Sequence, residues 1–322
     1  MWRFGVHRAM KRIALLLPVL GILLAACSSG GPGTSPDPGG SGDGGDAEHP
    51  TGSDEAIFII DFEGGFVPVQ FHATATPVFV LLGDGRVIVQ GMQTLEYPGP
   101  ALPPLMERTL TEEGIQAVLR AIGDTNLFAS DLDLRGAANF VADAPDTVFI
   151  LNGGGQEVTV RVYGLGTLAP GQDMPPGISS AEVQAHAVLQ QLHEQMLALE
   201  TWLPAGAWED EGWQPYEPEA FRLYVRDVTG QPIERGDLPE EVRTWPTDAD
   251  PAAFGEEQAF FGDGTRCGVV EGQEAAIWLE ELSSANQLTL WAPSADPDAR
   301  FSVAPRPLLP HEEVACPELV GA

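Results

Sequence analysis

Two pairs of apolar segments, each joined by a glycine-containing turn, constrain the fold of this chain most strongly. The first pair spans residues 78–89 around Gly83-Asp84-Gly85, and the second spans residues 147–162 around Gly153-Gly154-Gly155. Glycine and aspartate adopt the positive φ angles that tight hairpin turns need. The sequence therefore predicts two antiparallel hairpins, preceded by a strand at residues 57–60.

A segment with helical periodicity follows each hairpin. Thr111 is a typical N-cap, and Gly123 is placed to end the first helix. Ser179-x-x-Glu182 is a capping box that opens a longer second helix. The order hairpin, helix, hairpin, helix predicts an α+β domain over residues 56–203, in which an antiparallel sheet is packed on one side by helices.

The pattern breaks at residues 204–218, where tryptophan and tyrosine stand among prolines and acids, and we interpret this segment as a linker. Residues 219–322 are expected to form a second α+β domain. It begins with a half-buried strand near residues 221–225 and contains a helix at residues 273–285. Two further strands are predicted to close it: residues 288–291 and 300–303. Residues 228–264 show no clear pattern.

Residues 1–26 have the layout of a signal peptide. Four cationic side chains precede an apolar run over residues 13–26, which is shorter than the roughly 20 residues that a spanning helix needs. The next residue completes Leu24-Ala25-Ala26-Cys27, which resembles the lipobox of bacterial lipoproteins. The resemblance implies cleavage before Cys27, lipid attachment to Cys27, and a position on the extracytoplasmic face of the envelope, in either the inner or the outer membrane. The alternative is an ordinary secretory signal with a chance cysteine.

Residues 27–55 consist mainly of Gly, Ser, Pro and Asp and contain almost no apolar side chains. Such a segment buries too little surface to offset the loss of chain entropy on folding, so we expect a disordered acidic tether. Its length gives a root-mean-square reach of roughly 30 Å, which would hold a folded body off a membrane.

The charge of the chain excludes several partners. The signal segment holds four of the 16 Lys and Arg residues and none of the 47 acids, so the remainder carries 12 − 47 = −35 formal charges. Nucleic acids and anionic headgroups would be repelled, because their phosphates bind clustered Lys and Arg. The expected membrane attachment is therefore the lipid on Cys27.

Two residue types limit the chemistry. Lys11 is the only lysine and leaves with the signal, which excludes Schiff bases, Walker-type phosphate loops and Ser-x-x-Lys centres. With Cys27 lipidated, Cys267 and Cys316 remain as a pair in a compartment that permits disulfides, and we predict that they are bonded. Closing this loop would stabilise the fold by roughly 4 kcal/mol in the chain-entropy model.

Few residues are candidates for a metal site, and no cofactor is expected. The loop before the second hairpin carries four aspartates whose oxygens could assemble a calcium site, although the spacing is not that of an EF-hand and a solvated acidic loop is the alternative: Asp131, Asp133, Asp143 and Asp146. His186 and His193 are seven residues apart on one predicted helix, roughly 10 Å, which is too far to chelate one ion.

Trp208, Trp213 and Tyr216 form an aromatic, proline-rich stretch. Such residues can stack on sugar rings or on a partner peptide, so they are a candidate binding surface for an envelope protein or glycan. The alternative, which we favour, is that they pack between two domains. Nucleophilic motifs are missing, since no Gly-x-Ser-x-Gly elbow occurs in the sequence.

Residues 70–203 resemble domains of uncharacterised two-domain envelope lipoproteins, through the Gly-Asp-Gly hairpin, Leu-Thr-Glu-Glu-Gly at residues 110–114 and Asn126-Leu127-Phe128. The resemblance transfers no catalytic residue. We therefore expect a non-catalytic, lipid-anchored binding module. An inhibitor-like module and an envelope hydrolase working through paired carboxylates are the alternatives, and the hydrolase predicts a deep pocket with a raised carboxyl pKa.

Overall fold

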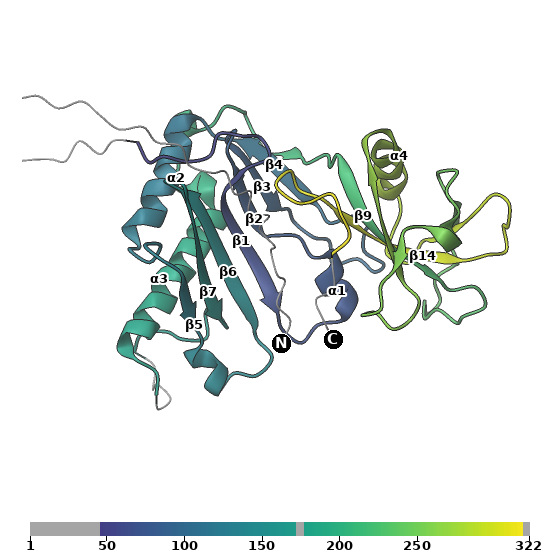
Figure 1. The fold of residues 1–322 in the computed structure, drawn as a ribbon, viewed down its shortest axis with the longest axis horizontal. Coiled ribbons are helices and arrows are strands. Elements are labelled where there is room, and N and C mark those ends of the chain that lie inside the picture. The colour runs from purple at the N-terminus through teal and green to yellow at the C-terminus, as the bar shows by residue number, and fades with distance from the viewer. Residues whose placement is uncertain (1–45, 172–176, 318–322) are drawn as a thin grey trace, which may run out of the picture. The chain divides into compact units, whose positions relative to one another are not determined.

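The computed structural model describes residues 46–171 and 177–317 (Figure 1). The fold is mixed α/β and consists mostly of strands, which form an eight-stranded and a six-stranded sheet. The described residues also contain four α-helices and several short 3₁₀ turns. Both sheets belong to one compact unit that begins at Ala47.

Strand β1 (Ala56–Gly64) lies inside the first sheet, whose order is β5-β7-β6-β1-β2-β3-β4-β8. The hairpin of β2 (Phe79–Leu82) and β3 (Arg86–Gln90) pairs with one edge of β1. The hairpin of β6 (Pro145–Gly153) and β7 (Gln156–Tyr163) pairs with the other edge. Both predicted hairpins are confirmed.

The outer strands correct the expectation of a purely antiparallel sheet. Strand β4 (Leu105–Thr109) pairs with β3, and β8 (Gln214–Pro215) pairs with β4, both antiparallel. Strand β5 (Leu132–Leu134) instead runs parallel to β7. The Thr159 amide on β7 donates to the Asp131 carboxylate beside this short strand, which gives β5 a side-chain attachment at the sheet edge.

Two helices cover one face of the first sheet, as expected. Helix α2 (Glu112–Asp124) starts at Thr111, whose hydroxyl accepts a hydrogen bond from the Gly114 amide. Helix α3 (Ser180–Leu197) starts at Ser179, whose hydroxyl accepts from the Glu182 amide. Only half of the predicted capping box forms, because the Glu182 carboxylate accepts from the amide of Gly136 at 2.6 Å.

The opposite face of the first sheet is partly covered by the C-terminal tail, residues 308–317. Leu309 packs into a buried cluster with residues of β1, β2 and β3, among them Ile59 and Val80. The Tyr216 hydroxyl donates to the carbonyl oxygen of Leu308 at 3.0 Å. The tail therefore acts as a second cover, on the face opposite the helices, which the sequence did not predict.

The second sheet is built around β9 and has the order β10-β13-β14-β9-β12-β11. Its strands pair antiparallel, except that β10 and β13 are parallel. Helix α4 (Gly272–Ser283) buries Trp278 between the rings of Trp245 and Trp291. The bounds of the strands are Ala220–Asp227 (β9), Val242–Thr244 (β10), Glu256–Glu257 (β11), Arg266–Glu271 (β12), Leu290–Ala292 (β13) and Phe301–Pro307 (β14).

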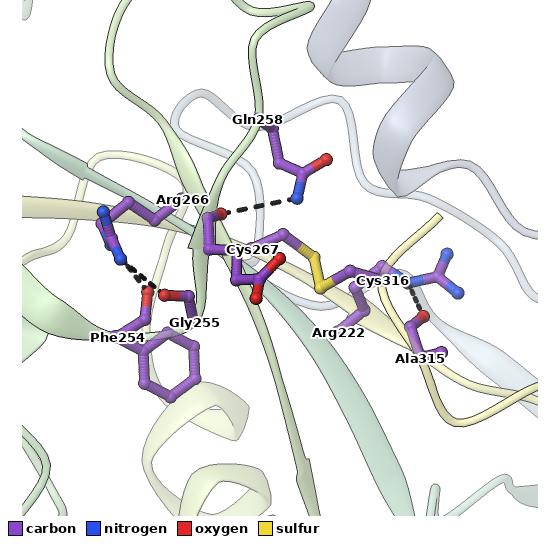
Figure 2. Close-up of a disulfide and its surroundings, with 9 residues drawn as sticks. Arg222, Phe254, Gly255, Gln258, Arg266, Cys267, Ala315 and Cys316 are labelled. Carbon is purple, nitrogen blue, oxygen red and sulfur yellow. Dashed lines mark hydrogen bonds between the residues drawn. A yellow bond between two sulfur atoms is a disulfide. The ribbon is translucent and has the colours of Figure 1, made fainter. Parts of the chain in front are cut away.

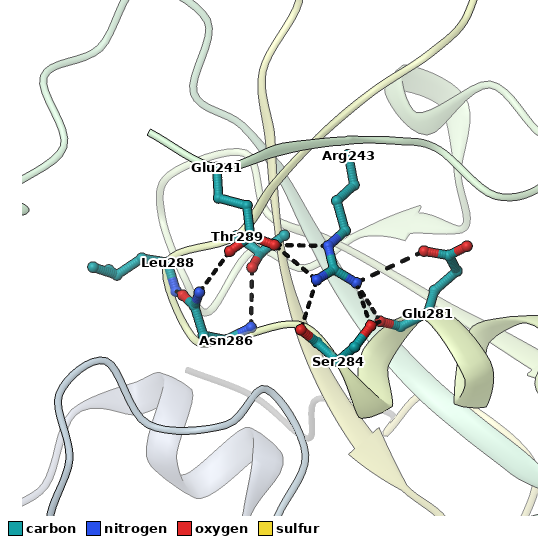
Figure 3. A network of polar contacts seen from close by, with 7 residues as sticks. All are labelled: Glu241, Arg243, Glu281, Ser284, Asn286, Leu288 and Thr289. Atoms are coloured by element: carbon teal, nitrogen blue, oxygen red, sulfur yellow. Dashed lines mark hydrogen bonds and ion pairs between the residues drawn. The ribbon is translucent and has the colours of Figure 1, made fainter. Parts of the chain in front are cut away.

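Arg243 on β10 ties the end of α4 to the second sheet (Figure 3). Its guanidinium donates to the carbonyl oxygens of Glu281 and Ser284 and to the Ser284 hydroxyl. The Glu241 carboxylate accepts from Arg243 and from the Asn286 amide. Carbonyls at a helix C-terminus lack partners within the helix, so this network satisfies groups that would otherwise be left unpaired.

Cys267 on β12 and Cys316 in the tail lie at disulfide distance, with Cα atoms 6.1 Å apart (Figure 2). Arg222 on β9 donates from Nε to the carbonyl oxygen of Ala315 beside them. The predicted pair is therefore present, and it ties the tail to the second sheet. Whether residues 204–218 separate two domains stays a prediction.

Residues 1–26 and Cys27 lie outside the described residues, so the lipobox expectation stays a prediction. The last part of the predicted tether makes specific contacts from Ala47 on, where Gln116 of α2 exchanges two hydrogen bonds with the Ala47 backbone. Among the described residues, none of the helices combines the length and hydropathy that crossing a membrane requires.

Candidate functional site

Most of the exposed large apolar side chains in the described residues lie on segments at one end of the first sheet. The register of β1 with β2 and β6, and of β2 with β3, places the end of β1, the start of β2, the end of β3 and the start of β6 together. The segments that leave this end carry the side chains that define what we call the apolar end: Phe62, Phe66, Val67, Val69, Phe71, Met92, Leu95, Tyr97 and Phe140.

The connection from β1 to β2 is the centre of the apolar end. It contains helix α1 (Val69–Thr74), which buries none of its residues. Phe66 is 87% exposed and Phe71 is 58% exposed. Large aromatic side chains normally supply core packing, so the exposure of two of them within one short connection is unusual.

The connection is held at both ends by backbone contacts. Gly64 and Gly65 have φ angles of 72° and 83°, which a side chain would strain, and they turn the chain away from β1. The Phe66 amide then donates to the carbonyl oxygen of Asp143. After α1, the carbonyl oxygen of Ala75 accepts from the guanidinium of Arg306. The apolar side chains are therefore presented from a fixed backbone.

Charge changes abruptly at the apolar end. Residues 64–83 contain no Asp, Glu, Lys or Arg, although the chain holds 47 acids. Acidic residues flank this uncharged stretch: Glu63, which is ion-paired with Arg161, precedes it, and Glu96 and Asp143 lie in the neighbouring connections. The apolar end is therefore an uncharged surface with an acidic rim.

Three of the four aspartates predicted as calcium ligands use their carboxylates in other contacts. Asp146 lies 3.2 Å from Arg135 and 3.8 Å from Arg161, and Asp133 lies 3.7 Å from Arg135. Asp131 accepts an amide hydrogen bond, and Asp143 contributes its carbonyl to Phe66. Within residues 46–171 and 177–317, no group of three or more His, Cys, Asp or Glu could hold a metal ion. The geometry thus gives the calcium interpretation no support.

Asp61 has the perturbed pKa that a carboxylate hydrolase would need, but it lies beside the charged groups that attach the tail. Burial raises the pKa of Asp61 to about 6, against the lowering effect of Arg306. Arg306 donates to both carboxylate oxygens of Glu312. Burial favours protonation of Glu312, but the hydrogen bonds and charge of Arg306 hold its pKa below the usual value. These groups attach the tail to the sheet, and Asp61 lines neither the cleft around residues 131–161 nor the cleft around residues 228–300.

The aromatic stretch is used in packing. Trp208 is 9% exposed, with its ring 5.9 Å from the ring of Trp213 and 4.1 Å from the guanidinium carbon of Arg108. Trp213 is half-buried against the same core as α2 and α3. Tyr216 packs beneath the tail, and burial raises its pKa. Trp208 and Trp213 therefore pack on the core of the first sheet, while packing between two domains and a binding surface both stay predictions.

Of the two histidines of α3, His186 is buried and His193 is half-buried. Burial lowers the pKa of both His186 and His193, and their ring nitrogens have no hydrogen-bond partner among the described residues. The His193 ring centroid lies 6.0 Å from that of Phe62. Both side chains therefore act as uncharged packing residues.

Comparison with known proteins gives no family assignment. No protein-family model matches this chain, and no curated protein or solved structure is significantly similar to it. The apolar end is the feature that sequence reasoning missed. The run of residues 64–83 without fixed charge, interrupted by Pro68, was the available signal.

Proposed function

We propose that this chain is a lipid-anchored, extracytoplasmic binding module that docks a protein partner through the apolar end of its first sheet. The observation that carries the proposal is the exposure of Phe66, Phe71 and their apolar neighbours on a backbone held at both ends. Exposed aromatic residues contribute strongly to interfaces, and a pre-ordered backbone reduces the entropy lost on binding.

The N-terminal segment joins the first sheet far from the apolar end. This placement favours a docking partner other than the membrane that carries the anchor. The Glu48 carbonyl accepts from the Gly154 amide, and the Glu55 carbonyl accepts from the Gly83 amide. Both contacts lie at the hairpin turns, which form the end of the sheet opposite the apolar end. Strand β1 has nine residues and so separates the two ends by roughly 30 Å. The chain that would carry a lipid on Cys27 therefore joins the first sheet at the turn end, and the apolar end is not the point of attachment.

Charge defines the chemistry of the partner. The chain without its signal segment carries 12 − 47 = −35 formal charges, and Glu96 and Asp143 flank the apolar end. An interface with this rim fits a protein surface that offers apolar side chains flanked by Lys or Arg. An anionic lipid surface or a nucleic acid would be repelled.

Site-specific photo-cross-linking in the native envelope tests this proposal. Phe66 or Phe71 is replaced by p-benzoylphenylalanine, and Ile277, which is 37% exposed on α4, receives the same replacement as a matched control. We expect one discrete protein adduct from positions 66 and 71 that is missing at position 277. Adducts with lipid alone, adducts that are the same at all three positions, or no adduct at all would overturn the proposal.

The anchor is tested separately. A Cys27→Ala variant is expected to lose incorporation of labelled palmitate and to leave the membrane fraction, while the variants at positions 66 and 71 keep both properties. Retention of the Cys27→Ala protein in the membrane fraction without lipid would contradict the anchoring part of the proposal and leave the docking part to be judged by cross-linking.

A further inference from the structure

A cleft of about 470 Å³ opens beside the end of β9 in the second sheet. Its lining combines apolar side chains, among them Ile233 and Leu290, with two arginines, Arg235 and Arg300. The chain has only 16 Lys and Arg residues against 47 acids, so two guanidinium groups facing one hollow are notable. The cleft lies apart from the apolar end and is independent of the function proposed above.

Arg235 is buried without a full set of partners. Its side chain is 11% exposed, and its Nη2 lies 3.7 Å from Oε2 of Glu240. Its Nη1 is shielded from solvent and has no hydrogen-bond partner among the described residues. Buried donors are nearly always paired in folded proteins, so the guanidinium of Arg235 keeps hydrogen-bonding capacity that the described residues do not use.

Arg300 is held in a fixed orientation next to the same carboxylate. Its Nη1 donates to the carbonyl oxygens of Pro297 and Ala299, both at 2.8 Å. Its Nε donates to Oε1 of Glu240 at 2.7 Å. The Glu240 carboxylate therefore lies between two guanidinium groups. Its side chain is 45% exposed, so it can rotate into solvent and free this position for another carboxylate.

We propose that this cleft binds a small organic carboxylate with an apolar substituent. The ligand carboxylate takes the place of Glu240 between Arg235 and Arg300, where guanidinium groups bind a carboxylate by charge-assisted hydrogen bonds. The apolar substituent lies against Ile233 and Leu290. Asp298 also lines the cleft and disfavours a second negative charge, so the site selects monoanions over dianions.

Calorimetry with two matched probes tests this inference on the chain beginning at Cys27 and at low ionic strength. Hexanoate and hexanamide have the same apolar chain and differ in charge. We expect hexanoate to bind with a dissociation constant on the order of 1 mM, as its size allows, and hexanamide to bind at least about tenfold more weakly. Equal affinity for the two probes, or no heat with hexanoate, would overturn the inference.

Two substitutions with opposite expected effects sharpen the test. Arg235→Gln should weaken hexanoate binding at least about tenfold, because it removes one guanidinium. Glu240→Gln should strengthen binding several-fold, because it removes the internal competitor. Arg120→Gln, on the exposed face of α2, is the control and should leave the affinity unchanged. If Glu240 and the arginines only hold the loop in place, Glu240→Gln will not strengthen binding.

A measurement on the unmodified protein guards against variants that fail to fold. The NMR signals of arginine Nε–Hε groups report directly on guanidinium contacts. Addition of hexanoate should shift the signals of Arg235 and Arg300 and leave that of Arg120 in place, whereas hexanamide should shift none of them. Shifts spread over all arginines would mean that hexanoate acts as a general counter-ion, and the inference would then be wrong.

Discussion

Strand β1 passes from a covered to an uncovered part of the molecule, and two of its phenylalanines show the difference. Phe58 is fully buried, with its ring centroid within 6.3 Å of those of Phe79, Phe128 and Phe149. Phe62 is four residues further on, so it points to the same face, yet it is 42% exposed. The same residue type in the same strand therefore serves the core at one position and the surface at the other.

The other face of β1 changes at the same place. Ile59 is buried beneath Leu309 of the tail, whereas Asp61, two residues on, lies among charged groups near Arg306. Both covers of the sheet thus become less complete past the middle of β1, where the strand is half-buried or exposed. Whether a residue of β1 is buried depends on segments that are distant in the sequence and pack over the strand. The local sequence pattern of the strand does not show which residues those segments cover.

The largest loss of stability is expected for a substitution in the first half of β1, which is covered on both faces. Phe58→Ala removes a fully buried ring and should lower the free energy of unfolding by about 3–5 kcal/mol. Phe62→Ala in the uncovered half should cost less than about 1 kcal/mol. Urea unfolding followed by circular dichroism measures both values. Equal losses would show that the two halves are packed alike.

Removing the attachment of the tail should have the next largest effect. The double variant Cys267→Ser and Cys316→Ser should lose about 2–4 kcal/mol and leave the tail face more open. The unmodified protein under reducing conditions is the control and should reproduce the loss. An unchanged midpoint in urea for both samples would mean that the tail stays in place without the covalent link.

Asp61 lies where the cover ends and should make stability depend on pH. Its pKa of about 6 in the folded state exceeds the ordinary value of 3.8, so the folded protein holds this proton more tightly than the unfolded chain. Its contribution to stability is therefore greatest below pH 4, falls between about pH 4 and pH 6, and is constant above. Asp61→Asn should gain about 1–3 kcal/mol at pH 8 and little at pH 4.

Urea unfolding of the Asp61→Asn variant across this pH range checks the prediction. Asp133→Asn, at an exposed position near Arg135, is the matched control and should show no such gain. A gain for Asp61→Asn that is as large at pH 4 as at pH 8 would place its origin in packing rather than in ionisation.

The smallest effect is expected in the uncovered region itself. Phe66→Ser should change the free energy of unfolding by no more than about 0.5 kcal/mol, because the side chain is 87% exposed and contributes little to packing. The melting temperature measured by scanning calorimetry tests this. A melting temperature lower by several degrees would show that the Phe66 side chain is packed against the fold. The difference between covered and uncovered phenylalanines would then not hold.

Local signals made much of the fold predictable from the sequence. The turns at Gly83–Gly85 and Gly153–Gly155 and the caps at Thr111 and Ser179 each act within a few residues, and all four are found where expected. The parallel strands β5 and β10 have three residues each, too few to show a period, and their positions depend on partners elsewhere in the chain.

The candidate site was less predictable because residue type does not determine exposure. Trp208 and Trp213 suggested a surface, but Arg108 and the core beneath α2 and α3 cover them. Phe66 and Phe71 belong to an apolar run that is typical of a core segment, and only the three-dimensional arrangement shows that nothing in the described residues covers them. The pairing of Arg306 with Glu312 likewise required the path of the tail.

The path of the tail also sets the order in which the protein can fold. Ile59 and Leu309 pack together although 309 − 59 = 250 residues separate them along the chain. During synthesis this apolar face of the first sheet stays exposed until the segment that packs against it has been made. Contacts of such long sequence separation slow folding and prolong the lifetime of partly folded species that aggregate. The last described segment therefore determines how long the first strands need protection.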